Sequence, residues 1–140
     1  MFGVLFHIIC YDAWFYVSHI FFHTPTFYVF HKIHHKKKYS EIKYFDTTEG
    51  HFIEHVIQPL GILVPCFFPG FSPNQMIFSW TIISVRGLMR HDDRFSWLIG
   101  NHHLLHHKHP KYNFGEYWID KLFGTIYYDE REYKYGILYT

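Results

Sequence analysis

Cysteine is scarce in this sequence of 140 residues, because only Cys10 and Cys66 occur and both lie in apolar stretches. A disulfide framework and a thiolate metal site are therefore not expected, and each thiol is interpreted as a small buried hydrophobe. The net charge is also small, at +1 with histidine neutral. A nucleic-acid partner is not expected, because the basic run Lys36–Lys38 lacks the wider basic face that such a site needs.

Formal charge is almost missing from the first stretch of the chain, where Asp12 is the only charged residue before Lys32. The stretch lacks the basic start and the small-residue cleavage site of a signal peptide. It predicts a helix that enters or spans the bilayer and breaks near Pro25. The lysines that follow it predict, by the positive-inside rule, that this flank faces the cytosol.

A second stretch without formal charge runs from His55 to Val85, and its middle contains Pro65, Pro69 and Pro73. Proline ends helices, so the pattern predicts two apolar helices joined by a tight turn, each roughly 25 Å long. We interpret them as a helical hairpin that dips into or crosses the membrane, with a buried hairpin of a soluble protein as the alternative. The predicted fold is all-α, as one domain over residues 1–140.

Histidine is abundant, with 14 residues that fall in separated, patterned groups. One group reads H-x-x-x-H and two read H-x-x-H-H, and residues three or four apart share one face of a helix. Each group is therefore expected to aim its imidazoles at one point, and eight imidazoles exceed what one ion needs. The eight are His19, His23, His31, His34, His35, His103, His106 and His107.

The pattern thus predicts a centre of two metal ions beside a membrane. Structural zinc usually takes four ligands in a closed tetrahedron. Ligation by many histidines favours redox-active iron, although imidazole also suits zinc and the spacing leaves both metals open.

The flanking residues resemble a known family. The D-A-W-F-Y segment at 12–16, ahead of the first pair, resembles the first histidine box of the fatty acid hydroxylase and sterol desaturase superfamily, and H-K-I-H-H at 31–35 resembles the second. The H-x-x-H-H motif at 103–107, followed by N-F-G at 113–115 and D-x-L-F-G-T at 120–125, resembles the third box and the signature ending. The order and flanks are most similar to the 4-methylsterol oxidase branch.

This resemblance, over roughly residues 8–126, implies an integral membrane enzyme with two irons and a histidine cluster on the cytosolic side of the endoplasmic reticulum. It implies hydroxylation or desaturation of a sterol or long acyl lipid with O2. Electrons would come from NAD(P)H through a reductase and a b-type cytochrome. No catalytic residue beyond the metal ligands is expected.

Position within the family pattern adds His51 and His91 as the ninth and tenth expected ligands. His51 falls where the family often has a His-Pro-x-Glu segment, with Phe52 in place of proline. His91 falls in a segment that is usually His-Ser-Gly-like, with Asp92 and Asp93 in place of the small residues. These two acids are candidates for orienting imidazoles.

Three further carboxylates have expected supporting roles. Asp12 and Glu54 are candidates for orienting ligand histidines, and Asp120 is expected to cap or brace the closing helix. A lipid is expected to enter sideways between the hairpin and the first helix, along a path that aromatic side chains could line. These are Trp14, Phe15, Phe22 and Trp80.

Two other functions remain open at the level of sequence. One is a zinc-dependent membrane hydrolase on the same histidine scaffold. The other is a catalytically degenerate, metal-binding membrane protein, because family members usually have further membrane helices before the first box and only 18 residues precede His19.

Overall fold

The structure is a computed structural model that describes residues 2–138, and within that range every regular element is helical, as predicted. Several of these helices position the site, and short helical turns connect them. The elements are α1 (Phe2–Phe22), α2 (Tyr28–His31), η1 (Tyr39–Glu41), η2 (Tyr44–Thr48), α3 (Phe52–Ile57), η3 (Gln58–Phe67), α4 (Pro73–Arg90), η4 (Asp93–Phe95), α5 (Ser96–Ile99), α6 (His102–Lys108), α7 (Tyr117–Phe123) and η5 (Glu130–Glu132).

Helix α1 is the one element of residues 2–138 that is long and apolar enough to cross a membrane. It ends at Phe22, slightly before the predicted break at Pro25. The reason is local, because a proline disfavours helical backbone in the residue before it. Thr24 also donates its hydroxyl to the carbonyl of Phe21 at 2.7 Å, which closes the last turn.

The 3₁₀ helix η3 packs closely on α1. Gly61 permits this approach, because a Cβ at that position would lie 2.4 Å from Cβ of Trp14. Pro65 has no N–H, so the carbonyl of Ile62 lacks its usual 3₁₀ donor. The buried ring of His7 replaces that donor, with Nδ1 2.8 Å from the Ile62 oxygen. His7 is thus part of the helix packing.

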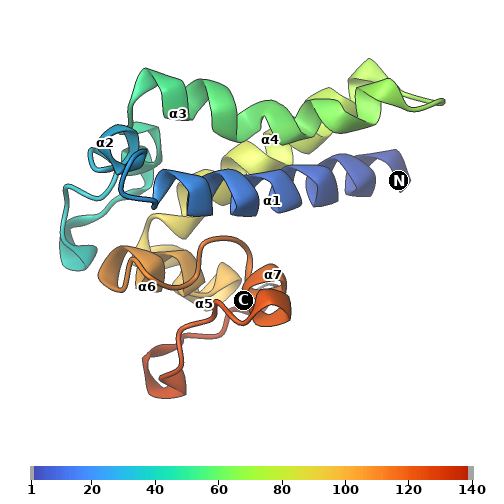
Figure 1. The fold of residues 1–140 in the computed structure, drawn as a ribbon. Helices are drawn as coiled ribbons and strands as arrows, with labels where there is room; N and C mark the ends of the chain where they lie inside the picture. The colour runs from blue at the N-terminus through green and yellow to red at the C-terminus, as the bar shows by residue number, and fades with distance from the viewer. Residues whose placement is uncertain (1, 139–140) are drawn as a thin grey trace.

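The structure contains two helical segments and a turn where the hairpin was expected. The chain turns through residues 68–72 between η3 and α4, in agreement with the predicted proline-rich turn. However, η3 and α4 both pack mainly against α1 and contact each other little, while α3 contacts η3 and α2. Figure 1 shows α1 beside α3–η3, with α4 crossing both and α5, α6 and α7 gathered on the other side of α1.

A buried network of four charges ties α1, α4 and the start of α7 together. Asp12 accepts hydrogen bonds from Arg86, one of them at 3.1 Å, and Arg86 also lies 3.3 Å from Glu116. Glu116 pairs in turn with Arg90. The expectation that Asp12 orients a ligand histidine is wrong, because this lone acid of an apolar helix requires a cationic partner.

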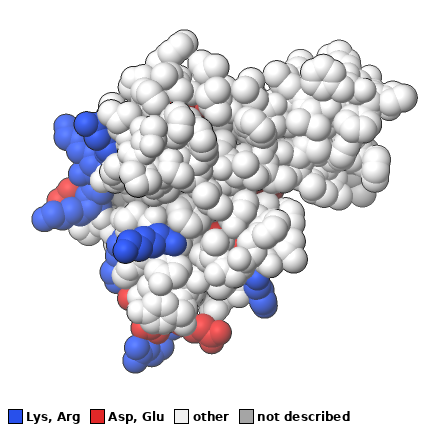
Figure 2. All heavy atoms as spheres, viewed as in Figure 1, with Lys and Arg blue, Asp and Glu red and all other residues white. Residues whose placement is uncertain are grey.

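Large apolar side chains remain exposed on the outward faces of α1, η3 and α4. Figure 2 shows that charged side chains are absent from part of this surface. The lobe formed by the start of α1 and the 68–72 turn carries no Lys, Arg, Asp or Glu on the visible face. Contiguous exposed apolar surface of this kind marks contact with lipid or with another protein. Examples are Leu5, Val17, Leu63, Phe67, Phe78 and Val85.

Candidate metal centre

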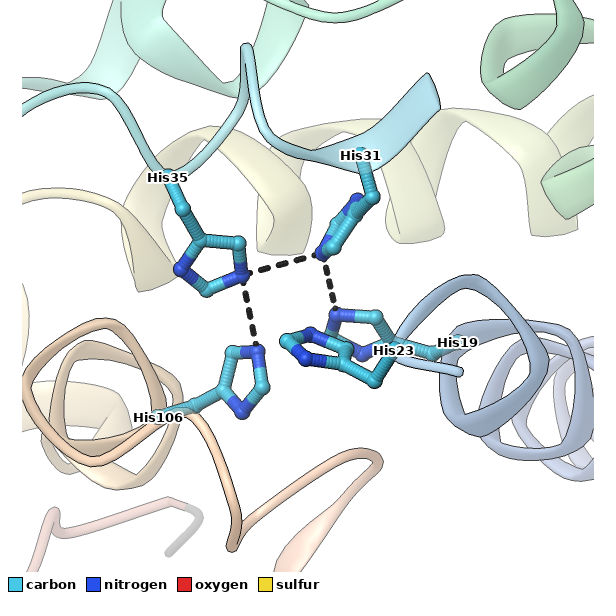
Figure 3. A group of neighbouring side chains, drawn as sticks. All are labelled: His19, His23, His31, His35 and His106. Carbon is cyan, nitrogen blue, oxygen red and sulfur yellow. Dashed lines mark hydrogen bonds between the residues drawn. The ribbon is translucent and has the colours of Figure 1, made fainter. Parts of the chain in front are cut away.

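Nine of the ten predicted ligands converge where the end of α1 meets α2, the end of α4 and α6. They form two groups, and within each group the candidate ligand nitrogens lie within 4.8 Å of one another. The first group, drawn in Figure 3, comprises His19, His23, His31, His35 and His106. The second comprises His34, His91, His103 and His107.

Each H-x-x-H-H motif divides its imidazoles between the two groups, so the expectation that a motif aims at one point is wrong. His31 and His35 belong to the first group, whereas His34 belongs to the second. The third box does the reverse, because only its middle histidine, His106, joins the first group. Residues four apart nearly eclipse on a helix, while adjacent residues diverge by about 100°. The doublet therefore bridges two sites.

Backbone carbonyls fix the orientation of two first-group rings. Nδ1 of His19 lies 2.5 Å from the oxygen of Phe114, and Nδ1 of His106 lies 2.6 Å from the oxygen of Tyr112. A carbonyl can only accept a hydrogen bond, so each Nδ1 carries the proton. Each Nε2 is then left with a bare lone pair that points into the group.

Glu54 holds a third ring in the same way, with its carboxylate 2.8 Å from Nδ1 of His31, as expected for an orienting acid. The Nε2 atoms then face one another. Nε2 of His31 lies 2.9 Å from that of His19 and 3.0 Å from that of His35. Nε2 of His35 lies 3.1 Å from that of His106. The Nε2 lone pairs of His19 and His31, both of which have their proton on Nδ1, repel at such a distance unless a cation lies between them.

The second group repeats this arrangement. Nδ1 of His34 lies 3.0 Å from the carbonyl oxygen of Glu49, and Nδ1 of His91 lies 2.8 Å from that of Gly87. Both Nε2 atoms therefore carry lone pairs, and they lie 3.1 Å apart. Nε2 of His103 also lies 3.1 Å from that of His91.

These residues fit a pair of metal ions. Adjacent imidazole nitrogens bound at about 2.1 Å and at right angles lie about 3.0 Å apart, whereas a tetrahedral ion separates them by about 3.4 Å. The observed separations are 2.9 to 3.1 Å. Buried nitrogens without a hydrogen-bond partner within residues 2–138 complete the donor set. They are His23 Nε2 and the ring nitrogens of His107, and each of these two rings supplies one ligand atom.

Burial also keeps the imidazoles neutral, which is the form that binds metal. Loss of solvation lowers the pKa of His35 to about 2, with a smaller contribution from neighbouring histidines. The same causes hold the pKa values of His106 and His107 well below the ordinary range. No proton therefore has to be displaced at neutral pH.

Asp120 braces the loop that supplies the orienting carbonyls. It accepts hydrogen bonds from the backbone N–H groups of Phe114 at 2.9 Å and Gly115 at 2.8 Å, and from the hydroxyl of Thr125 at 2.6 Å. The ring of His102, which lies outside both groups, contacts the same carboxylate at 3.0 Å. Asp120 was expected to cap or brace the closing helix, and these contacts tie that helix to the loop before it and to Thr125 after it.

Three predicted site residues lie elsewhere. The structure does not bring His51 into either group, because its Nδ1 accepts a hydrogen bond from the backbone at the start of α3. Asp92 pairs with Arg94, and Asp93 pairs with Lys134. The expectation that these two acids orient imidazoles is therefore wrong.

A cavity of about 530 Å³ opens beside both groups. Six histidines line it, together with apolar side chains that include Phe15, Ile83 and Leu88. Of the aromatics expected along a lipid path, Phe15 and Trp80 line the cavity, whereas the indole N–H of Trp14 donates to the carbonyl of Ile57. The six are His19, His31, His34, His91 and His103, which belong to the two groups, and His55, which belongs to neither.

The orienting carbonyls could not be found from sequence, because every residue has one. The ion pair of Asp12 with Arg86, in contrast, could have been predicted from the sequence. A lone acid in an apolar helix needs a cation, and Arg86 is the first charge after the second apolar stretch.

The comparisons with known proteins agree with this geometry. The profile of the family described as Fatty acid hydroxylase matches residues 4–125, which is most of the chain. No curated protein and no solved structure shows significant similarity to it. The family consists of hydroxylase-type enzymes that are typically metal-dependent and membrane-associated. The chain belongs to the fatty acid hydroxylase family.

Proposed function

We propose that this chain is a membrane-bound di-iron oxygenase that hydroxylates or desaturates a sterol or a long-chain lipid. The observation that supports this most strongly is the pair of adjacent all-imidazole groups that open on one half-apolar cavity. Bound iron would supply the redox chemistry that an unactivated C–H bond requires. Hydroxylation would consume O2, two electrons and two protons per C–H bond and release water, with electrons from NAD(P)H through a reductase and a b-type cytochrome.

The protein's own contribution is to orient ligands and to position the lipid. Glu54 and the braced 112–115 loop fix the imidazoles of the first group before any ion arrives. An apolar wall that includes Phe15, Ile83 and Trp80 lines the same cavity as imidazoles of both groups. A hydrocarbon segment held against this wall excludes water and lies next to the metal centre.

The same proposal places the apolar lobe in a bilayer. Helix α1 has the length and composition of a span, and α3–η3 and α4 expose apolar side chains beside it. Lys32, Lys36 and Lys38 are exposed near the histidine groups. By the positive-inside rule these lysines support a cytosolic position for the metal centre, and we propose the endoplasmic reticulum as the membrane.

The test is to purify the chain in detergent, count iron and zinc per chain, and assay sterols and fatty acyl lipids with a reductase system. His34→Ala and His106→Ala, one from each group, should abolish oxidation. His109→Ala is the matched control, since His109 lies outside both groups and contacts Glu132. Retained turnover in either site variant, with metal bound, would contradict the assignment.

The metal count separates the other candidates. About two irons per chain supports the oxygenase. Two zincs with activity in the absence of O2 would establish a zinc hydrolase on the same scaffold instead. A folded chain that binds no metal would identify a degenerate, non-catalytic member of the family.

A further inference from the structure

A second cavity, of about 550 Å³, lies in the lobe where the start of α1 meets the 68–72 turn (Figure 1). His7 lines it, and at about 1.5 Å of rise per residue this histidine lies roughly 18 Å along α1 from His19 of the metal centre. Within residues 2–138, the two cavities share no lining residue, and none that lines this one is Lys, Arg, Asp or Glu. It is therefore a separate candidate site.

His7 brings a buried hydrogen-bond acceptor to this cavity. The residue is only 1% exposed, and its Nδ1 lies 2.8 Å from the carbonyl oxygen of Ile62. A carbonyl can only accept, so Nδ1 carries the proton and Nε2 carries a lone pair. No group within residues 2–138 donates a hydrogen bond to that Nε2. Packing against η3 thus uses one ring nitrogen and leaves the other for a ligand.

Gln75 brings a second polar group to the same place. Its carboxamide packs over Gly3, where an added Cβ would clash with the amide oxygen. Gly3 and His7 are four residues apart, so they share one face of α1 and the carboxamide lies about one turn from the imidazole. The carboxamide makes no hydrogen bond to any described residue. Two polar groups without partners are unfavourable in an apolar lobe unless a ligand satisfies them.

We propose that this cavity binds a neutral lipid with a free hydroxyl group, which donates to Nε2 of His7 and accepts from the amide of Gln75. A hydroxyl can donate and accept at once, which these two partners require. A carboxylate or a phosphate does not suit the site, because no cationic side chain within residues 2–138 lines it. Water offers the same hydrogen bonds, but it does not suit the apolar remainder of so large a cavity.

Aromatic side chains provide the surface for the hydrocarbon part of this lipid. The ring of Phe71 lies 6.1 Å from that of His7, and Phe6 meets Phe68 edge-on at 5.5 Å. Phe68 and Phe71 remain 53% and 37% exposed, so the cavity opens on the apolar surface that we place in the bilayer. The inference rests on the proposed function in this placement alone, because it involves no oxidation.

The test uses the full chain in detergent micelles and two photoactivatable diazirine probes with a free hydroxyl, one a cholesterol and the other a diacylglycerol. Labelled residues are mapped by mass spectrometry. We expect at least one probe to label residues 65–75, with competition by the unlabelled alcohol but not by its methyl ether, which cannot donate. The probe that labels distinguishes a sterol from an acylglycerol. No labelling of this segment by either probe, or equal competition by the methyl ether, would overturn the proposal.

Two variants remove one hydrogen bond each. His7→Asn retains a donor for the carbonyl of Ile62 but has no group at the position of Nε2, and Gln75→Leu retains the size of the side chain without its amide. Each should weaken competition by the alcohol about tenfold, and either one suffices if the other fails to fold. Thr81→Val, which removes a hydroxyl from α4 outside the cavity, is the matched control and should change nothing.

Unchanged competition in both folded variants would overturn the assignment of His7 and Gln75. The labelling requires no turnover, so it is independent of the reaction at the metal centre. Labelling of this cavity in a chain that oxidises no lipid would contradict the oxygenase and support the second site. Lipid oxidation by a chain that neither probe labels here would overturn the second site and leave the oxygenase standing.

Discussion

The two histidine groups differ in how their outer nitrogens are held. In the first group, a carboxylate and two carbonyls anchor the rings, since Glu54 holds His31 and the 112–115 loop holds His19 and His106. That loop is itself fixed by the buried carboxylate of Asp120. The anchors are thus present before any metal binds.

The second group has fewer anchors. His34 and His91 donate to backbone carbonyls, but Nδ1 of His103 and both ring nitrogens of His107 have no hydrogen-bond partner within residues 2–138. It also has four imidazoles instead of five. Outer hydrogen bonds fix ring orientation and raise ligand basicity. We therefore expect the first group to bind its ion more tightly, and the second to be the weaker site.

The largest expected effect comes from the neighbours His34 and His35, which serve different groups. Both alanine variants should lose turnover. His34→Ala should also release one ion, because three imidazoles remain in the second group, whereas His35→Ala should keep most of its metal on the remaining four. Elemental analysis of each purified variant measures this difference. Equal metal loss in the two variants would show that the groups do not differ as we infer.

Removal of Asp120 should damage the first group through its supporting loop. Asp120→Ala leaves two buried backbone N–H groups and the ring of His102 without their acceptor. Each lost partner costs roughly 1–3 kcal/mol, so we expect the free energy of unfolding to fall by about 3 kcal/mol or more. Thermal unfolding measures the change. Asp129→Ala is the control, because within residues 2–138 that carboxylate contacts only the neighbouring Arg131, and it should lower the midpoint much less.

The difference between the groups also marks what the sequence could and could not predict. The two stretches without formal charge correctly predicted the positions of α1 and α4. An apolar stretch bounded by proline has few structures other than a helix to adopt. Adjacent residues of a helix point in directions about 100° apart, so the spacing alone could have predicted that His34 and His35 join different groups. The carbonyls of Tyr112 and Phe114 could not be predicted, because tertiary folding alone decides which backbone groups meet a given ring.

His51 is the opposite case, a ligand that was predicted from the sequence but that the structure does not place in either group. Its position in the family pattern predicted a ligand, yet the structure leaves it at the start of α3, four residues before His55 and three before Glu54. Its cap fixes the helix that carries Glu54, so its influence on the metal is indirect. His51→Ala should therefore retain both ions, and loss of one ion in a folded variant would restore it to the ligand set.

Glu54→Gln tests the carboxylate anchor of the first group alone. Glutamine keeps the shape but cannot become the carboxylate that accepts from Nδ1 of His31, so the metal affinity of the first group should fall about 10- to 100-fold. Competition with a chelator measures the affinity of each site. Glu49→Gln is the matched control, because Glu49 holds His34 through its backbone carbonyl. An unchanged affinity in Glu54→Gln would mean that the carboxylate is not an anchor.

The smallest effect, and the finest test of the comparison, is the order in which the groups lose metal as pH falls. Burial lowers the pKa of His34, but the carbonyl contact with Glu49 and the nearby carboxylates of Asp46 and Glu49 oppose the shift. Burial lowers the pKa of His35 to about 2 without such opposition. Protons compete with metal for the same nitrogen, so His34 is protonated at the higher pH. Stepwise dialysis below neutral pH should therefore show a plateau at one ion per chain, with the second group emptied first; simultaneous loss of both ions would contradict this order.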